Sequence, residues 1–314
     1  MLRYILTRVL STIPVMMVVA IFVFLMLRLA PGDPAAVIAG DYATAEDVIR
    51  IREKLGLNAS IPVQFLKWVG TLMQGDLGTS IFTNLPVTTL IGQRIEPTLM
   101  LGLTTIVFAV LVAVPLGTLA AWKSGSLIDR FVMLFSVGGF SVPVFVLGYI
   151  LIYILAMQLK WLPVQGYKNI YDFGVLAFLR HIALPTMTLS VIFIALIARM
   201  TRASVMEVLQ EDYIRTARAK GQSEFKILTR HALRNAAVPI VTVIGIGIAL
   251  LIGGVVVTES VYNIPGLGRL VLDAVLARDY PIIQGLILFF SFVYVLINLV
   301  IDLSYIVLDP RIRY

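Results

Sequence analysis

The residues of this chain that could carry out chemistry are few, and their spacing argues against an active site. The 314 residues include no cysteine, which excludes thiolate nucleophiles, disulfides and Cys-ligated metals. His181 and His231 lie far apart in the sequence, and a zinc site built on them would need several carboxylates. Asp302 is the one unambiguous acid within the apolar runs, and a single carboxylate cannot form the dyad of an intramembrane protease. We therefore expect no catalytic, metal or cofactor site in this chain.

A nucleotide site is the next chemistry to test, because Gly117 to Ser124 nearly fits the phosphate-binding pattern G-x-x-x-x-G-K-S. Trp122 stands where the second glycine is required. An indole there would block the approach of the backbone to the phosphates, and no predicted strand precedes the segment. Lys123 is better interpreted as the cytoplasmic anchor of a membrane span.

The elements that carry these residues are predicted to be apolar helices. Hydrophobic residues make up 59% of the chain and charged residues 14%, which is too apolar for an ordinary soluble domain. Six apolar runs without Lys or Arg approach or exceed the roughly 20 residues that a helix needs to cross a bilayer. Because backbone groups in lipid must be satisfied internally, we predict an all-α integral membrane protein with six transmembrane helices, divided into 1–97 and a five-span core, 98–314. The runs cover residues 9–27, 98–122, 131–159, 181–198, 238–258 and 283–307.

Basic residues indicate the orientation of these helices. Fourteen of the 25 Lys and Arg residues lie in four connections that alternate with longer, less basic ones. Eight of them fall between Arg199 and Arg234, and they weigh most under the positive-inside rule. We therefore expect a multi-pass protein of a bacterial inner membrane with both termini cytoplasmic, and we assign the net charge of +7 to membrane topology rather than to a nucleic-acid partner. The four connections are residues 1–8, 123–130, 199–237 and 308–314.

The long segment 31–97 follows the first span, which we expect to remain uncleaved, and is predicted to lie outside. It has helix punctuation of its own. Thr44 and Asp47 have the spacing of a capping box, and Gly56 marks the end of the helix that they begin.

A second external helix is predicted directly afterwards. Ser60 can cap it, Pro62 suits its first turn, and the apolar residues that follow have helical spacing. Trp68 would suit the lipid headgroups, which favours a helix on the membrane surface. The alternative is that this helix packs against the spans.

Residues 199–237 are far more than a hairpin between two spans needs, so we expect this connection to have a task. Glu211 to Gly221 is typical of a short helix that ends on a glycine, with Lys220 in the last turn, where the helix dipole favours a cation. Ser223 can cap a second helix with an apolar side. The prediction is an exposed helix–turn–helix; the alternative is a solvated basic loop attracted to anionic lipid.

The run Tyr213-Ile-Arg-Thr-Ala-Arg-Ala-Lys-Gly221, followed by His231-Ala-Leu-Arg-Asn235, resembles the coupling loop of the dipeptide and oligopeptide permease family of ABC importers. Other motifs, in order along the chain, are similar to the B-type subunit of this peptide, nickel and glutathione family. The chain departs from the broader importer pattern at Arg215-Thr216-Ala217, where Glu-Ala-Ala is usual, and at Arg234, where proline is usual. Both departures look like the peptide branch. The other motifs are Pro31-Gly-Asp-Pro34, Gly75-Asp-Leu-Gly78, Asn263-Ile-Pro-Gly-Leu-Gly268, Arg278-Asp-Tyr-Pro281 and Asp309-Pro-Arg-Ile-Arg-Tyr314.

The resemblance implies the type I architecture of ABC importer permeases and a subunit that moves dipeptide-like peptides by ATP-driven alternating access. It implies a second, homologous permease subunit in a heterodimer, two ATP-binding subunits and an external peptide-binding protein. ATP and Mg would be bound by the ATP-binding subunits, and this chain would catalyse nothing. The residues implied to couple to those subunits are Glu211, Asp212, Tyr213, Ile214, Arg215, Thr216, Ala217, Lys220 and Gly221.

Candidate residues for the translocation path lie near the outer end of the fifth span. Glu259 opens a loop to Gly268 whose glycines and proline suit a re-entrant turn that lines a cavity; the alternative is an ordinary surface turn. Glu259 could meet a peptide amine and Arg269 a peptide carboxylate. Asp302 is either a path residue or a hydrogen-bonding partner between helices, and the structural role is favoured. The full candidate set is Glu259, Tyr262, Asn263, Arg269 and Asp302.

Several alternatives stay open on the sequence. A passive channel or scaffold and a membrane-embedded enzyme are the rival classes, and within the family the solute could be a dipeptide, a longer peptide, glutathione or a nickel complex. Glycines 245, 247, 253 and 254 would allow close helix approach, which makes the fifth span our first choice for the seam with a partner subunit.

Overall fold

The computed structural model describes residues 2–29, 34–39, 43–54 and 56–308. Helices dominate these residues, and an isolated bridge between Thr79 and Pro86 is the only β pairing among them. The all-α prediction is therefore confirmed. The chain divides into two compact units: residues 1–96 with 269–296, and residues 97–268 with 297–314. The motifs at 31–34 and 309–314 lie largely or wholly outside the described residues.

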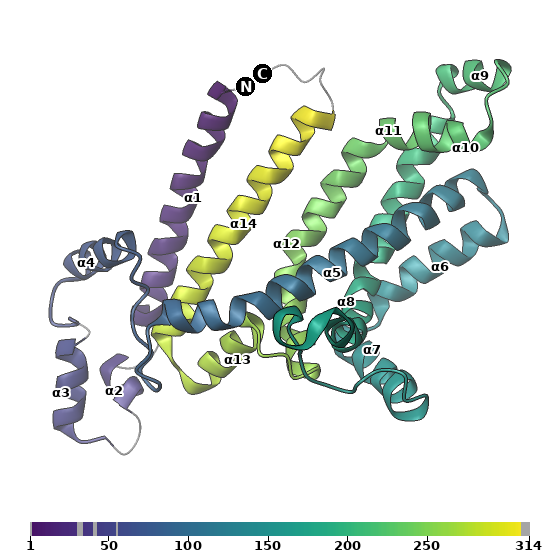
Figure 1. Ribbon diagram of the computed structural model, residues 1–314. Helices are drawn as coiled ribbons and strands as arrows, with labels where there is room; N and C mark the ends of the chain where they lie inside the picture. The colour runs from purple at the N-terminus through teal and green to yellow at the C-terminus, as the bar shows by residue number, and fades with distance from the viewer. Residues whose placement is uncertain (1, 30–33, 40–42, 55, 309–314) are drawn as a thin grey trace. The chain divides into compact units, whose positions relative to one another are not determined.

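The first unit contains four helices of its own and parts of three others. Figure 1 shows α1 beside α14, and a hydrogen bond from Gln284 Nε2 to the Val23 carbonyl (2.9 Å) joins them. The four helices are α1 (Leu2–Leu29), α2 (Pro34–Ala39), α3 (Ala45–Lys54) and α4 (Ile61–Met73), and the shared ones are α5 (Val87–Trp122), α13 (Leu267–Ala277) and α14 (Tyr280–Leu308).

The predicted capping box at α3 is confirmed, since the Asp47 amide donates to Thr44 Oγ1 (3.3 Å) and the Thr44 amide to Asp47 Oδ2 (3.2 Å). Gly56 adopts the positive φ of 65° expected just after a helix. The predicted cap at Ser60 is wrong in detail, because its side chain bonds none of the orphan amides of α4; Pro62 does lie in the first turn. Hydrogen bonds from Thr44 hold the pKa of Asp47 below its usual value.

Helix α4 packs against α1 through aromatic rings. The ring of Phe24 lies 5.1 Å from that of Phe65 and 5.6 Å from that of Trp68, measured between centroids. Phe24 is almost completely buried. Of the two alternatives for Trp68, packing against a span is the arrangement in the structure.

The connection between α4 and α5 is fastened to the start of α14. Asp279 is buried and accepts hydrogen bonds from Ser80 Oγ (2.6 Å) and the Ile81 amide (3.4 Å). A Cβ on Gly78, whose φ is 91°, would lie 3.7 Å from Pro281. Two of the family-like motifs, Gly75–Gly78 and Arg278–Pro281, therefore meet inside the first unit.

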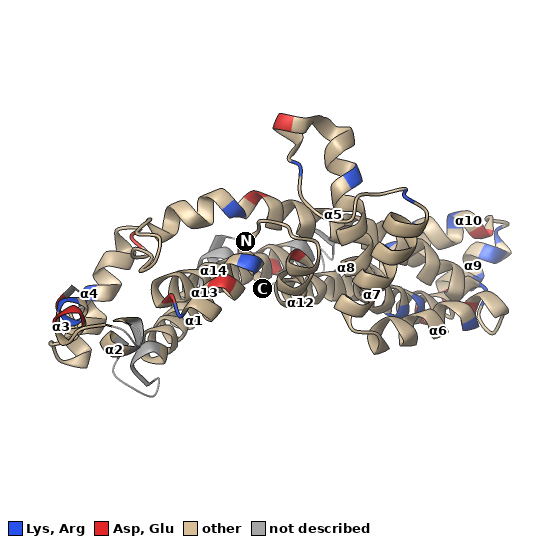
Figure 2. Cartoon of the chain, turned by 90° about the horizontal axis from the view of Figure 1, so that it is seen from below, with Lys and Arg blue, Asp and Glu red and all other residues tan. Residues whose placement is uncertain are grey.

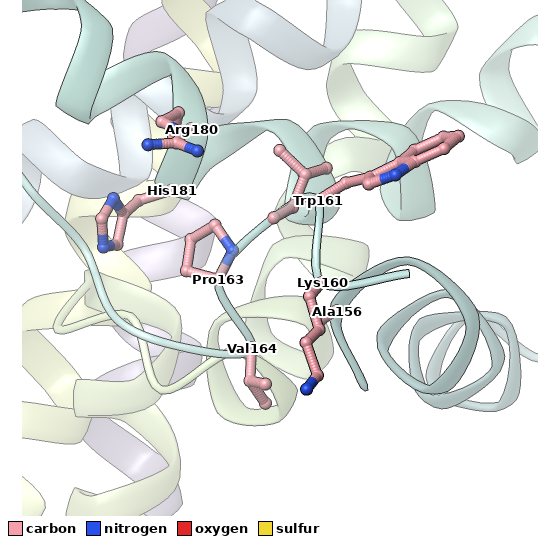
Figure 3. A pocket seen from close by; sticks show the side chains of 8 residues that line it. Ala156, Lys160, Trp161, Pro163, Val164, Arg180 and His181 are labelled. Carbon is pink, nitrogen blue, oxygen red and sulfur yellow. The ribbon is translucent and has the colours of Figure 1, made fainter. Parts of the chain in front are cut away.

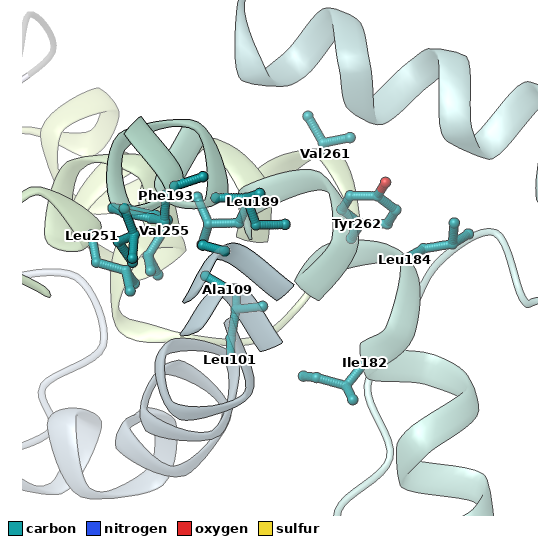
Figure 4. Packing of buried hydrophobic residues seen from close by; sticks show 14 of the residues in the cluster. Leu101, Ala109, Ile182, Leu184, Leu189, Phe193, Leu251, Val255, Val261 and Tyr262 are labelled. Carbon is teal, nitrogen blue, oxygen red and sulfur yellow. The ribbon is translucent and has the colours of Figure 1, made fainter. Parts of the chain in front are cut away.

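The second unit is built around α8 (Ile170–Leu209) and α12 (Ala237–Val261), with α5, α6 (Leu127–Ser141), α7 (Val144–Leu151) and η1 (Ile152–Gln158) against them. Figure 4 shows the core, in which Leu101 and Ala109 of α5 meet Leu189 and Phe193 of α8 and Val255 of α12. The glycines of α12 allow this packing. A Cβ added at Gly245 would lie 2.4 Å from Ile301, one at Gly247 would lie 3.2 Å from Phe193, and one at Gly254 would lie 2.8 Å from Leu189.

The apolar run 131–159 does not form the single continuous helix that we expected. Helices α6 and α7 with η1 meet at an angle of 107°. Pro143 lacks a backbone donor and restricts the residue before it, and Val142 is extended (φ −94°, ψ 122°), so the helix ends there. The described residues hold four helices long and apolar enough to cross a membrane, or five if this bent pair is one span. Helix α1 contributes the shorter apolar stretch Leu10–Met26, and the count of six stays a prediction.

Candidate functional site

The connection between α8 and α12 folds into four short helical pieces, which we call the coupling segment. They are α9 (Asp212–Ala219), α10 (Glu224–Lys226), η2 (Ile227–Ala232) and α11 (Leu233–Asn235). Figure 1 shows them together at the end of the second unit where α8 ends and α12 begins. The predicted helix–turn–helix is thus present, although its second arm is a π-helical segment between two short α-turns.

The turn between the arms has the geometry that the sequence indicates. Gly221 adopts φ 76°, and its amide donates to the Arg218 carbonyl (2.9 Å), so α9 ends in a left-handed glycine. Ser223 begins the second arm in an extended conformation, without a hydrogen bond from an orphan amide to its side chain.

Side chains tie the two arms across this turn. Arg218 Nε donates to Glu224 Oε1 (2.8 Å), and His231 Nε2 lies 2.8 Å from Gln222 Oε1. The Glu224 carboxylate raises the pKa of the Arg218 guanidinium. Beneath the pair, Ile214 and Ile227 are completely buried against each other. The coupling segment is therefore a folded knob with a small core, not an open basic loop.

The coupling segment is also attached to the long helices. Leu228 and Ala232 of η2 pack with Val205 of α8 and Ala121 of α5 in one buried cluster. Below this cluster, the buried Asp129 at the start of α6 pairs with Arg202 of α8, with Arg202 Nη2 2.8 Å from Asp129 Oδ2. Motion applied to the coupling segment would reach α5, α6 and α8 through side-chain packing and this ion pair.

The outer face of α9 is charged and accessible. The side chains of Asp212 and Arg215 are 94% and 73% exposed, and Tyr213 is partly exposed. Figure 2 shows charged residues around α9 and α10 and none on α7. Burial, together with the charge of Glu211, raises the pKa of Tyr213. Of the predicted coupling residues, Ile214 and Ala217 form the inner face of α9, whereas Glu211, Asp212, Tyr213, Arg215, Thr216, Lys220 and Gly221 are exposed.

At the other end of α12, Glu259 forms a buried cluster with the loop that follows it. Its side chain has no exposed surface, and Thr98 Oγ1 donates to its Oε1 (2.6 Å). The same Thr98 oxygen accepts from the Leu267 amide (2.7 Å). A Cβ on Gly266 would lie 2.1 Å from Glu259 Oε1, so glycine is needed for the carboxylate to fit. This cluster, Thr98 with 259–268, is the outer-end cluster below.

The neighbouring candidates Tyr262 and Asn263 have different surroundings. Tyr262 is buried, and its hydroxyl lies 2.6 Å from Thr188 Oγ1 and 3.3 Å from the Gly148 carbonyl. Asn263 is exposed with φ 54°. The loop is a packed turn beneath a buried carboxylate, so the surface-turn alternative is wrong for Glu259 and Tyr262.

Arg269 directly follows the outer-end cluster in the chain, and Asp302 lies on α14. Arg269 is partly exposed and belongs to the first compact unit. Asp302 is partly exposed on the last third of α14, in the second unit. A path built from all five candidate residues stays a prediction.

Comparison with known families decides what kind of membrane protein carries these two features. Residues 113–314 match the family described as the binding-protein-dependent transport system inner membrane component, and residues 1–89 match the N-terminal family of the same membrane components. The chain belongs to this family.

Two curated relatives align with this chain over nearly its whole length. A probable peptide ABC transporter permease protein of Sinorhizobium fredii is 58% identical over 99% of both chains. The glutathione transport system permease protein of Salmonella typhimurium is 44% identical over 100% of both. A solved chain of the MetNI methionine ABC transporter, in an inward-facing conformation, has a TM-score of 0.57 and 17% identity over 71% of this chain and 97% of its own. That likeness gives the ABC importer permease fold.

Membership of this family fixes the general role of the chain. It is a multi-pass inner-membrane component of an ABC importer, which works with separate substrate-binding and ATP-binding components. It is not an enzyme, because ATP hydrolysis belongs to the separate subunits.

Sequence reasoning missed three pairs of side chains in this permease. Arg218 with Glu224 could have been found, since opposite charges flank the predicted glycine turn. Asp129 with Arg202 gave a weaker signal, as two charges at the ends of neighbouring spans. Thr98 with Glu259 gave none, because 161 residues separate them.

Proposed function

We propose that this chain is a permease subunit that moves small, dipeptide-like peptides inward across the membrane by ATP-driven alternating access. The observation that carries the proposal is the coupling segment, a folded charged knob packed against α5 and α8, with α8 in turn paired to α6 through Arg202 and Asp129. An ATPase subunit can move such a knob as one body, and a passive pore would not need it. The end-to-end likeness to a peptide permease component supports the choice of peptide.

The proposed assembly contains a second, homologous permease subunit in a heterodimer, two ATP-binding subunits and an external peptide-binding protein. ATP and Mg would be bound in the ATP-binding subunits. The exposed residues of α9, above all Asp212, Tyr213 and Arg215, would contact those subunits, and Ile214 and Ala217 would transmit the contact to η2. ATP binding would then shift the knob and open the path toward the binding protein.

Both termini are proposed to be cytoplasmic, with residues 31–97 outside. The positive-inside distribution of Lys and Arg supports this orientation. A cysteine at the exposed Asn58 should react with an impermeant thiol reagent once the outer membrane of intact cells is permeabilised. Labelling only after disruption of the inner membrane would invert the topology.

The path itself is proposed to involve the outer-end cluster. Glu259 could meet a peptide amine only after its bond to Thr98 breaks, because its carboxylate is covered in this conformation. Arg269 is proposed to meet the peptide carboxylate. Glu259→Gln combined with Arg269→Gln should lower uptake while leaving assembly intact, and unchanged transport kinetics in that double variant would end the idea.

The decisive experiment is reconstitution of the complete transporter in proteoliposomes with its binding protein. Labelled dialanine should accumulate with ATP, and excess unlabelled dipeptide should compete at least tenfold better than glutathione. The reverse order of competition would make the chain a glutathione permease, the runner-up that the relatives at 44% identity favour. Flux through this chain alone, without ATP-binding subunits, would favour a channel instead.

A further inference from the structure

A basic pocket at the end of the second unit opposite the coupling segment has no role in the proposed transport cycle. It has a volume of about 420 Å³ and lies between η1, the connection that follows it and the α8 side chains Arg180 and His181. Figure 3 shows Arg180 and His181 side by side on α8, facing Pro163, while Lys160 and Trp161 project from the connection. Ala156, Leu162 and Val164 complete the lining.

The positive charge of this pocket has no acidic partner in the part of the chain that the structure describes. No carboxylate of the described residues pairs with Lys160 or Arg180. His181 Nδ1 lies 2.8 Å from the Ala177 carbonyl, which can only accept, so Nδ1 carries a hydrogen and Nε2 is left as the second polar atom of the ring. A volume of this size with several basic groups suits an anionic ligand.

The charge is also on the disfavoured side of the membrane. In the proposed orientation, residues 159–181 lie outside, yet they hold Lys160, Lys168 and Arg180 against a single acid, Asp172. The positive-inside rule disfavours Lys and Arg in short outer connections. Among the described residues, Lys168 is the only one of the three that lies over an aromatic ring, with its Nζ 5.2 Å from the Phe173 centroid.

The surface next to the pocket is apolar and aromatic. A second hollow, of about 490 Å³, is lined by residues 145–154 of α7 and η1, directly before the residues that line the basic pocket. Tyr149 and Tyr153 are exposed there, and Trp161 is 64% exposed beside the pocket. Tyr and Trp are the residues that membrane proteins place at the headgroup level. The lining residues are Phe145, Val146, Tyr149, Ile150, Tyr153 and Ile154.

We propose that the pocket of Lys160, Arg180 and His181 binds the phosphate headgroup of an anionic phospholipid whose acyl chain lies on the apolar face of residues 145–154. The order along the chain, apolar hollow and then basic pocket, matches an amphipathic ligand with an acidic head. Basic pockets beside membrane helices recognise anionic lipid headgroups by the same chemistry. The proposal is independent of the transported solute.

The test measures lipid binding by the complete purified transporter, titrated in nanodiscs with dioleoyl phosphatidylglycerol against dioleoyl phosphatidylcholine. The wild type should prefer phosphatidylglycerol at least tenfold. Arg180→Gln and Lys160→Gln should each weaken its binding about fivefold, and together about 25-fold, because a basic residue near anionic lipid contributes about one such factor. Lys168→Gln is the matched control, with the same charge change in the same connection outside the pocket, and should change binding less than twofold.

Three results would overturn the proposal. Equal binding of the two lipids would exclude a headgroup site, and an equal loss in Lys168→Gln would reduce the effect to general charge. Displacement of phosphatidylglycerol by millimolar inorganic phosphate, or by peptide-loaded binding protein, would assign the pocket to a soluble anion or to a protein partner. Only variants whose subunits all coelute in size-exclusion chromatography are compared, so that misassembled complexes are excluded.

Discussion

Glu259 in the outer-end cluster and Arg218 in the coupling segment are both charged groups that fasten a turn to a neighbouring helix. Glu259 is completely buried, and its partners are Thr98 and a loop that tolerates no Cβ at Gly266. The Arg218–Glu224 pair, by contrast, has side chains 41% and 39% exposed, and a Cβ added at the Gly221 turn between them would meet no atom within 4 Å.

This difference in burial separates the two regions by function. A buried carboxylate that loses a partner keeps its full desolvation cost, so changes that crowd Glu259 or remove one of its partners should reduce folding and assembly, whereas the isosteric Glu259→Gln removes the charge itself. An exposed pair contributes about 1 kcal/mol or less, so changes in the coupling segment should leave the fold intact and affect the coupling to ATP.

The largest effect is expected for Gly268→Ala in the outer-end cluster. The new Cβ would lie 2.6 Å from the Val256 Cα, a backbone atom of α12 that cannot move aside alone. We expect a loss of about 3 kcal/mol, the upper range for overpacking, and little assembled complex. The control is Gly253→Ala on α12, the helix of Val256, where the new Cβ would meet no atom within 4 Å. This variant should leave the thermal unfolding of the purified complex unchanged.

Gly266→Ala should have a smaller effect that depends on Glu259. All three atoms nearest to its new Cβ belong to the Glu259 side chain. We expect a loss of about 1–3 kcal/mol in the wild type and almost none in a Glu259→Ala background, where the obstacle is absent. Equal losses of thermal stability in both backgrounds would contradict the geometry of the cluster.

Gly221→Val should leave the complex assembled and reduce peptide uptake. Gly221 has φ 76°, and a Cβ added there would meet no atom within 4 Å, so the change mainly strains the backbone, by about 1–2 kcal/mol. We expect that loaded binding protein no longer stimulates ATP hydrolysis in this variant. Gly221→Asn should have a milder defect, because asparagine tolerates the left-handed region. Normal uptake at wild-type expression would favour the alternative of a passive basic loop.

The smallest effect is expected for the Arg218–Glu224 pair. Arg218→Glu should cost about 1 kcal/mol or less, because the pair is partly exposed, and it should lower stimulated ATP hydrolysis modestly. The exchange of both charges, Arg218→Glu with Glu224→Arg, should restore stimulation if the pair ties the arms. Failure of the exchange, with the single variant impaired, would assign Arg218 to a contact outside this chain.

Local signals in the sequence predicted much of this structure. The Thr44–Asp47 box, the left-handed Gly221 and the apolar runs depend on residues within a few positions of each other, and each is present. The bend at Pro143 had a local signal too, but the strong apolarity of residues 131–159 favoured one continuous helix.

Contacts between distant residues could not be predicted in this way. No residue near Glu259 in the sequence indicates that Thr98 will contact it. The apolar face of the helix that carries Trp68 likewise does not indicate whether Trp68 lies on lipid or against Phe24. The candidate path residues were chosen by residue type and depth, which could not indicate that the Glu259 side chain would be completely buried.

The exposed face of α9 is proposed to dock the ATP-binding subunits, and crosslinking can test this directly. The natural absence of cysteine allows a single one to be placed at Arg215, 73% exposed, or, as a control, at Tyr171, 88% exposed at the opposite end of the unit. Each variant, in the complete transporter, would be labelled with a maleimide-benzophenone and illuminated with and without ATP. We predict a crosslink to an ATP-binding subunit from position 215 that changes in yield with ATP, and none from position 171. A crosslink from position 171, or none from position 215 in an assembled complex, would exclude the exposed face of α9 as the docking site of the ATP-binding subunits.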